Sequence, residues 1–126
     1  MMPDHLSILV SSLDISMPYY DALLPMIGFE KIRPHIWKNA DNFFIQFRQA
    51  HQGTSAYERY GAGMNHIGFG APDSDTVVRI RDSMDALGFE VPGIQRLNGA
   101  AAIFMKDPDG IRFEITYYPP GMDIVS

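Results

Sequence analysis

The fold is decided by the stretch KDPDGIRFEITY at residues 106–117. Its Asp-Pro-Asp-Gly segment predicts a tight turn, because proline presets φ, glycine accepts a positive φ and aspartates hydrogen-bond turn backbones. Apolar and polar residues then alternate from Ile111 to Tyr117, which is typical of a strand with one buried face. Glu114 lies in mid-strand on the polar face, where glutamate is disfavoured. An exposed sheet face or a functional role would each explain its position.

An internal repeat extends this pattern over the whole chain. The tripeptide Gly-Phe-Glu occurs at 28–30 and returns 60 residues later at 88–90. Later in each half the offset becomes 68 residues, as from Lys38 to Lys106, which fits a longer hairpin at about 92–99. Both halves show the order strand, helix, strand, strand, strand. We therefore expect the α+β class, with tandem β-α-β-β-β modules at about residues 3–50 and 64–120, a linker at about 51–63 and a single domain over 1–126.

The two helices are predicted from their caps. Candidate N-caps lie at 14–16 and 73–75, and Gly28 and Gly88 are expected to stop the helices. Pro18 suits a first helical turn, and Pro25 should end or kink the first helix. Strands are predicted at 5–10, 29–32, 36–38, 43–48, 65–70, 101–105 and 111–117, with a further strand beginning at 89–91.

The repeat places four polar residues at equivalent positions. His5 and His66 lie in the first strand of each module, and Gln46 and Glu114 in the last. If each sheet packs its apolar face on its helix, the four share the opposite face and can converge. Two imidazoles, one carboxylate and one amide oxygen make a divalent metal site with positions left for water or substrate. Gln46 is the weaker candidate, since it could equally be an outer-sphere donor or a polar cavity residue.

Neighbours on these strands predict the substrate contacts. Residues two positions from Gln46 or Glu114 share their face, which brings in Phe44, Arg48 and Arg112. Trp37 could line the wall. An arginine beside a metal would favour an anionic substrate, whereas arginines at strand ends can also extend to solvent.

Composition excludes several functional classes. The net charge of −5 argues against nucleic acid and anionic membranes as partners. The absence of cysteine excludes disulfides, thiolate ligands and a cysteine nucleophile. The N-terminus lacks a signal-peptide pattern, and no apolar run approaches the ~20 residues of a membrane span. A cytoplasmic protein is therefore expected.

The repeat, its four polar residues and the motif from Lys106 to Glu114 together resemble the vicinal oxygen chelate superfamily, the group of glyoxalases, bleomycin-resistance proteins and extradiol dioxygenases. The resemblance implies a cup-shaped, eight-stranded mixed sheet with the helices outside, and a homodimer. It also implies one divalent metal, with Zn, Fe, Mn and Ni not distinguished, that binds a small-molecule substrate through adjacent oxygens. The implied ligands are His5, Gln46, His66 and Glu114.

Two departures from the glutathione-dependent glyoxalase I pattern narrow the function. Gln46 stands where that pattern has a glutamate base, and an amide cannot accept a proton at neutral pH. Leu9 stands where that pattern has an arginine that binds glutathione. We expect a glyoxalase-like lyase or isomerase that acts on another small oxygen-rich substrate, with Glu114 as ligand and catalytic base. The alternatives are an extradiol-type ring-cleaving dioxygenase and a metal-free drug-binding module of the bleomycin-resistance type.

Overall fold

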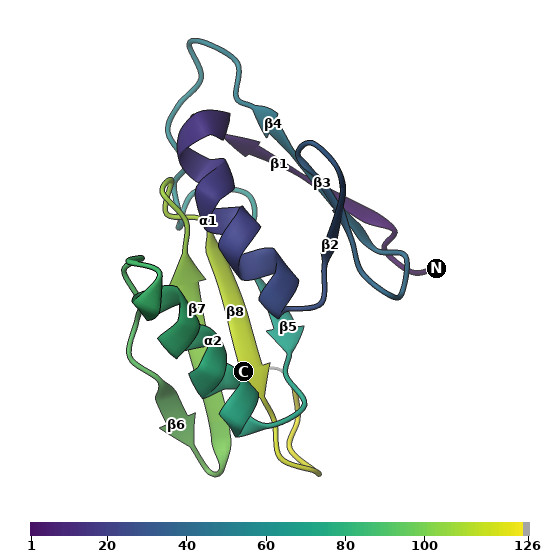
Figure 1. Cartoon of the computed structure of the whole chain (residues 1–126), viewed down its shortest axis with the longest axis vertical. Helices are drawn as coiled ribbons and strands as arrows, with labels where there is room; N and C mark the ends of the chain where they lie inside the picture. Colours follow the sequence, from purple (N-terminus) through teal and green to yellow (C-terminus); the bar gives the residue numbers. More distant parts are fainter. Residues whose placement is uncertain (125–126) are drawn as a thin grey trace. The chain divides into compact units, whose positions relative to one another are not determined.

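A computed structural model describes residues 1–124 of the chain. The chain divides into two compact units, Met1–Tyr57 together with Asp107–Asp109, and Glu58–Lys106 together with the residues from Gly110 on. The predicted α+β class with two β-α-β-β-β modules is confirmed (Figure 1). The elements in order are β1 (His5–Val10), α1 (Leu13–Met26), β2 (Glu30–Arg33), β3 (Ile36–Lys38), β4 (Phe44–Gln49), β5 (His66–Gly70), α2 (Ser74–Ala86), β6 (Gln95–Leu97), β7 (Ala100–Lys106) and β8 (Arg112–Tyr117).

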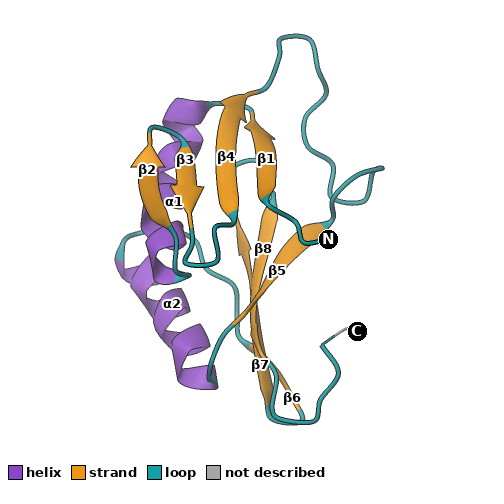
Figure 2. Cartoon of the chain, turned by 90° about the vertical axis from the view of Figure 1, so that its right-hand side faces the viewer, coloured by secondary structure: helices purple, strands orange, loops and turns teal. Residues whose placement is uncertain are grey.

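The first unit is a four-stranded mixed sheet in the order β1-β4-β3-β2. β1 runs parallel to β4, and the other pairs are antiparallel. Alternate residues such as Ile8 and Ile45 are buried on one face, which α1 covers (Figure 2). The ring of Tyr20 on α1 lies 4.2 Å from that of Phe47 on β4, centroid to centroid. Burial of these rings anchors the helix to the sheet, since aromatic side chains supply large apolar areas.

The second unit repeats this arrangement with the order β5-β8-β7-β6. β5 is parallel to β8, and the remaining pairs are antiparallel. The predicted apolar stripe of α2 is confirmed at Val77, Ile80 and Met84, which are buried. They lie on the helix that contacts β7 and β8, whose buried residues include Ile103 and Phe113. The eight strands thus form two four-stranded sheets, each with a helix on one face.

The strand registers confirm the predicted alignment of the two halves. In the first unit Gln46 is opposite Ser7 on β1 and Ile36 on β3. In the second, Glu114 is opposite Gly68 on β5 and Phe104 on β7. Ser7 and Gly68 each lie two residues after a histidine, so the two histidines hold the same register against Gln46 and Glu114.

The first helix begins earlier than predicted. Ser12 is its N-cap, with a hydroxyl that accepts from the Ile15 amide at 3.3 Å, so the caps expected at 14–16 are wrong. Pro18 consequently lies inside the helix rather than in its first turn. Pro25 falls in the last turn, where the helix ends as expected, and Gly28 follows with a φ of +91°.

The second helix begins where predicted. Asp73 is its N-cap and accepts hydrogen bonds from both the hydroxyl and the amide of Thr76, each at 2.7 Å. These bonds, the hydroxyl first, hold the pKa of the Asp73 carboxyl below its usual range. Neither helix of residues 1–124 is long and apolar enough to cross a bilayer.

The strand predicted to begin at 89–91 is wrong, because residues 87–94 are not in a strand. The second strand of this module is instead β6, joined to β7 by Asn98 and Gly99. Both residues have positive φ, +51° and +85°, as a two-residue hairpin turn requires. Residues 50–65, which include the predicted linker, contain no helix or strand.

The Asp-Pro-Asp-Gly turn is fixed by side chains as well as by its backbone. The Tyr20 hydroxyl donates to Oδ2 of Asp107 at 2.6 Å, and the Asp109 amide donates to Oδ1 of Asp107 at 2.9 Å. Asp109 in turn accepts from the Ser11 amide at 2.9 Å. Burial, reinforced by the Asp107 carboxylate, raises the pKa of Tyr20 far above its usual range. The turn is therefore tied to α1 and to the end of β1 within the first unit.

Candidate functional site

In the second unit, the sheet face opposite α2 carries three rows of residues set by strand register. The first row is His66, Arg112 and Lys106, taken across β5, β8 and β7; the second is Gly68, Glu114 and Phe104; the third is Gly70, Thr116 and Ala102. Residues directly opposite in a sheet share a face. Gly68, Gly70 and Ala102 are the small residues in these rows.

His66 and Glu114 interact directly on this face. Nε2 of His66 lies 3.0 Å from Oε2 of Glu114, and the exposed fractions of the two side chains are 36% and 15%. The Phe104 ring lies edge-on to the imidazole, with centroids 5.4 Å apart. Partial burial beside an aromatic ring strengthens the electrostatic interaction between the two side chains.

Two further residues hold the outer atoms of the pair, that is, the ring nitrogen and the carboxylate oxygen that do not face each other. Nδ1 of His66 lies 2.7 Å from the side-chain oxygen of Asn65, and the Thr116 hydroxyl lies 2.6 Å from Oε1 of Glu114. The Asn65 amide nitrogen donates to the Arg59 carbonyl at 3.0 Å, which fixes the amide with its oxygen toward the ring. Both ring nitrogens of His66 therefore face oxygen atoms, Nδ1 that of Asn65 and Nε2 that of Glu114.

Such a pair needs a positive charge between its facing atoms. With Nδ1–H donated to Asn65, Nε2 can approach the carboxylate oxygen only through a proton or a metal cation. Sequence reasoning did not assign Asn65 or Asp4 a role. The sequence does contain a feature that indicates them: each repeat histidine directly follows a residue with a side-chain oxygen, in Asp4-His5 and Asn65-His66.

Gly68 leaves Glu114 without a competing neighbour on β5. A Cβ at Gly68 would stand 3.9 Å from Oε2 of Glu114, which is ordinary van der Waals contact. The equivalent residue in the first unit is Ser7, whose hydroxyl accepts from the Gln46 amide at 3.2 Å. The same register therefore gives a histidine–carboxylate pair in one unit and a serine–glutamine pair in the other.

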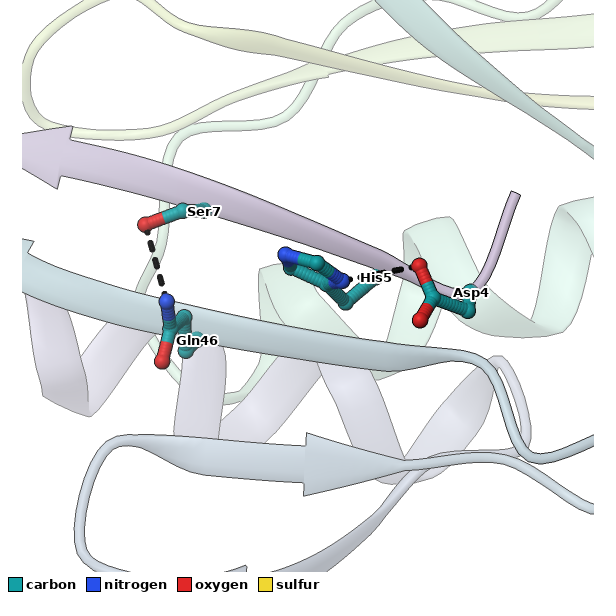
Figure 3. A network of polar contacts seen from close by, with 4 residues as sticks. All are labelled: Asp4, His5, Ser7 and Gln46. Atoms are coloured by element: carbon teal, nitrogen blue, oxygen red, sulfur yellow. Dashed lines mark hydrogen bonds and ion pairs between the residues drawn. The ribbon is translucent and has the colours of Figure 1, made fainter.

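The first unit presents its two predicted ligands on the exposed face of β1 and β4. Figure 3 shows the His5 ring with Nδ1 directed at Asp4, at 2.8 Å, and its other nitrogen directed away from Asp4. The Gln46 amide nitrogen is used by Ser7, so the oxygen, the atom that could bind a metal, points elsewhere (Figure 3). His5 and Asp4 are 59% and 86% exposed, so water competes for their contact.

The other predicted contact residues lie in different units or on different faces of their sheets. Phe44 and Arg48 lie on the His5 face of the first sheet, opposite His5 and Leu9 in register. Arg112 lies beside His66 in the second unit. Trp37 is buried and opposite Ile45, on the core face rather than the Gln46 face. The predicted place of Trp37 on the wall of the site is therefore not supported.

The donor atoms of the second unit suit a divalent metal. A nitrogen and an oxygen 3.0 Å apart are at a separation that two ligands of one ion can have when each bond is about 2.0–2.2 Å. Their outer atoms are held as those of metal-ligating histidines and carboxylates usually are. Within residues 1–124, no group of three His, Asp or Glu side chains is arranged to hold an ion. The second unit thus contributes a ligand pair, and the four-residue set remains a prediction.

Comparisons with known proteins agree with the fold. The sequence profile of the glyoxalase/bleomycin resistance protein/dioxygenase superfamily matches residues 3–115. None of the curated proteins compared is similar enough in sequence to match.

Three solved structures illustrate the likeness. A candidate glyoxalase from Bacillus halodurans is 24% identical with a TM-score of 0.77, over 93% of this chain and 96% of that one. A glyoxylase/bleomycin resistance protein/dioxygenase domain from Frankia sp. EAN1pec is 19% identical with a TM-score of 0.77, over 97% and 95%. The fosfomycin resistance protein FosX from Listeria monocytogenes is 19% identical with a TM-score of 0.70, over 95% of each chain. The chain belongs to the glyoxalase/bleomycin resistance protein/dioxygenase superfamily, as its repeat and motif predicted.

Proposed function

We propose that this chain is a metal-dependent enzyme of the glyoxalase-like lyase or isomerase type that acts on a small oxygen-rich substrate. The observation that carries the proposal is the His66–Glu114 pair, with its facing atoms 3.0 Å apart and its outer atoms held by Asn65 and Thr116. We retain His5 and Gln46 as the other proposed ligands.

The residues around Glu114 suit proton transfer. Thr116 holds Oε1, and Oε2 faces Nε2 of His66, so Oε2 is the proposed metal-binding oxygen and would have to leave the metal to accept a substrate proton. Glu114 is 15% exposed, which limits the competition from water. A bound divalent ion supplies Lewis-acid stabilisation of negative charge that develops on a substrate oxygen.

Cationic residues on the same face favour an anionic substrate. Arg112 is opposite both His66 and Lys106 in register, which gives two cations beside the pair. A planar guanidinium recognises carboxylate or phosphonate groups through paired hydrogen bonds. Arg48 is the proposed equivalent on the first unit.

The substrate is proposed to be other than the glutathione adduct of methylglyoxal. Gln46 offers an amide where a second base would be needed. Leu9 is exposed on the His5 face of β1 and carries no charge to hold a glutathione carboxylate.

Metal titration tests the proposal. We would remove metal with a chelator and titrate the chain with Co²⁺, Zn²⁺, Mn²⁺, Ni²⁺ and, without oxygen, Fe²⁺, following binding by calorimetry and Co²⁺ by its visible absorption. One ion per chain is expected, and Glu114→Ala or His66→Ala should abolish tight binding. Glu90→Ala is the matched control, because this carboxylate is exposed in the same unit.

The outcomes separate the candidate functions. If no divalent ion binds and Glu114→Ala changes nothing, a metal-free binding module replaces the enzyme. Oxygen consumption with catechols in the presence of Fe²⁺ would support the extradiol dioxygenase instead. Mixing His5→Ala and Glu114→Ala chains tests the proposed homodimer as a source of shared ligands, because recovered metal binding would require ligands from two chains.

A further inference from the structure

We propose that Lys106 and Arg112 form a subsite for the phosphate or phosphonate group of a small molecule, on the sheet face of the second unit that carries Glu114. The idea that this group belongs to a substrate rests on the proposed function, but the chain alone makes the subsite, which needs no metal. Its basis is that the two cations lie opposite each other on β7 and β8 without an acidic partner.

The two cations are neighbours by strand register. Arg112, which is half-buried, is directly opposite the exposed Lys106, and opposite residues have Cβ atoms about 4.5–5.5 Å apart. Within residues 1–124, neither side chain lies within ion-pair distance of a carboxylate. Like charges directly opposite each other destabilise a sheet. The pair is therefore unfavourable in the free chain, and a bound anion would relieve the repulsion.

The acidic residues nearest in sequence contact other groups. Asp107 follows Lys106, but it is buried and accepts a hydrogen bond from the Tyr20 hydroxyl. Glu114 lies two residues after Arg112 on the same face, and its two oxygens contact a threonine hydroxyl and an imidazole instead. Neither carboxylate therefore pairs with the two cations.

The equivalent position in the first unit shows a different arrangement. Phe44 occupies the register of Arg112 there and lies opposite Lys38 on β3. The Lys38 ammonium lies over the Phe44 ring, 6.0 Å from its centroid, in a cation–π contact. The second unit keeps the lysine, as Lys106, and has a second cation in place of its aromatic partner. The repeat thus supplies an internal reference in which the lysine is stabilised without an anion.

The charge and shape of the pair favour a phosphate or phosphonate group over a carboxylate. A guanidinium is a planar fork that binds two oxygens of one group, and an ammonium is a point charge that can bind a third. A phosphate group on a small molecule carries close to two negative charges at neutral pH and has three terminal oxygens. One such group matches both cations, whereas one carboxylate has a single charge and leaves one cation unmatched.

Anion titrations of the metal-free chain test the subsite. The probes are inorganic phosphate, methylphosphonate and acetate, in a buffer of low ionic strength at about pH 8, where imidazoles are neutral. Calorimetry measures affinity, and thermal unfolding measures the rise in Tm that a ligand of the folded state produces. We expect one phosphate or methylphosphonate per chain, each with a rise in Tm, and weaker binding of acetate.

Three substitutions locate the binding. Arg112→Phe recreates the lysine–phenylalanine pair of the first unit, and Lys106→Gln removes the other cation. Each should weaken phosphate and methylphosphonate binding by about 10–100-fold, the factor that corresponds to the loss of a hydrogen bond to a charged group. Lys38→Gln is the matched control in the first unit and should leave both affinities unchanged. Far-UV circular dichroism checks that each variant is folded.

Stability without any added anion gives an independent result. Arg112→Phe should raise the Tm by about 1–4 °C, because it removes the like-charge repulsion and adds a cation–π contact. Lys106→Gln should also raise the Tm, so the test does not depend on one variant. In saturating methylphosphonate the wild type should regain this difference, since only the wild type binds the anion tightly.

The outcomes separate this inference from the proposed function. The subsite is overturned if the wild type binds neither phosphate nor methylphosphonate, if it binds phosphate alone, if acetate binds equally well, or if Lys106→Gln keeps full affinity. A chain that binds methylphosphonate but no divalent ion keeps the subsite and loses the proposed enzyme. A chain that binds the ion but no methylphosphonate keeps the enzyme and loses the subsite.

Discussion

The substitution Tyr20→Phe tests whether the Asp-Pro-Asp-Gly turn is held by α1. It removes one hydroxyl and leaves the ring against Phe47, so apolar burial is almost unchanged. The lost bond is short, 2.6 Å, and its acceptor Asp107 is only 4% exposed. A hydrogen bond to a charged group contributes about 1.5–3 kcal/mol. Asp107 keeps the Asp109 amide as a donor, so we expect a loss within this range.

Urea unfolding followed by circular dichroism measures this loss. For a chain of this size the expected change corresponds to a fall in Tm of about 5–15 °C, with an unchanged urea m-value because the buried surface is the same. Tyr60→Phe is the control, since Tyr60 is 82% exposed and should change the free energy of unfolding by less than about 0.5 kcal/mol. A Tyr20→Phe variant as stable as this control would refute the reasoning.

The pH dependence gives a second test of the same bond. Burial and then the Asp107 carboxylate raise the pKa of Tyr20 above its usual value of about 10. The hydroxyl's contribution is therefore complete below about pH 10 and is lost above it, where the unfolded chain releases a proton that the folded chain retains. The stability difference between wild type and Tyr20→Phe should shrink by up to about 1.4 kcal/mol per pH unit above 10. A difference that stays constant from pH 9 to 11 would contradict the buried bond.

Substitutions at three further positions test the hairpin, the site and the second helix. Gly99→Ala should lower the free energy of unfolding by about 1–2 kcal/mol in thermal or urea unfolding. The reason is that φ of Gly99 is +85° and a Cβ there would stand 3.3 Å from Pro119. An unchanged stability would count against this turn. Gly68→Ala should preserve Co²⁺ affinity, whereas Gly68→Ser should reduce it several-fold, since a serine hydroxyl can donate to Glu114. Equal affinities of the two variants would contradict the idea that position 68 must lack a hydrogen-bonding side chain. Asp73→Ala should lower the Tm at neutral pH, and the difference from the wild type should vanish in acid. Hydrogen bonds to α2 lower the pKa of Asp73, so the contribution of its carboxylate is lost as the pH falls through that lowered value. A difference in Tm that persists in acid would mean that the carboxylate cap is not its source.

The equivalence of Gln46 and Glu114 could be predicted because the same strand pattern occurs in both halves of the sequence. A single mid-strand glutamate is ambiguous, but a glutamine at the matching position of the other half fixes the alignment. The period of two in strands then decides which face each residue occupies. The structure adds which residues they face across the sheet, Ile36 for Gln46 and Phe104 for Glu114.

The errors occurred where the two halves differ. A strand is predicted to begin at 89–91, but the second module has a longer connection there and its strand begins at Gln95. The Asn98-Gly99 dipeptide marks that hairpin locally and would have been the better guide. The first helix differs for another reason: caps at 14–16 would put Pro18 in its first turn, whereas the helix begins at Leu13 and contains Pro18 in its interior, where proline removes a backbone donor.

The long-range polar contacts could not be predicted from spacing. Tyr20 and Asp107 are separated by 87 positions, and the alignment of Asp107 with Asn39 in the repeat gives no indication of a partner on the first helix. Asn65 shows how a local signal can be missed for a different reason. A side-chain oxygen before each histidine was visible in the sequence, but its meaning depends on which ring nitrogen it contacts, and only coordinates supply that.

The two units show how one backbone register can carry two different chemistries. Each unit places a histidine two residues before the position opposite a polar side chain on its last strand. In the first unit the Ser7 hydroxyl accepts a hydrogen bond from the Gln46 amide. In the second unit Gly68 has no side chain, and Glu114 contacts His66. Because Gly68 has no side chain, no group at that position of β5 competes with Nε2 of His66 for Oε2 of Glu114. Introducing a serine at 68 should therefore weaken the pair as a metal ligand while the sheet itself stays intact.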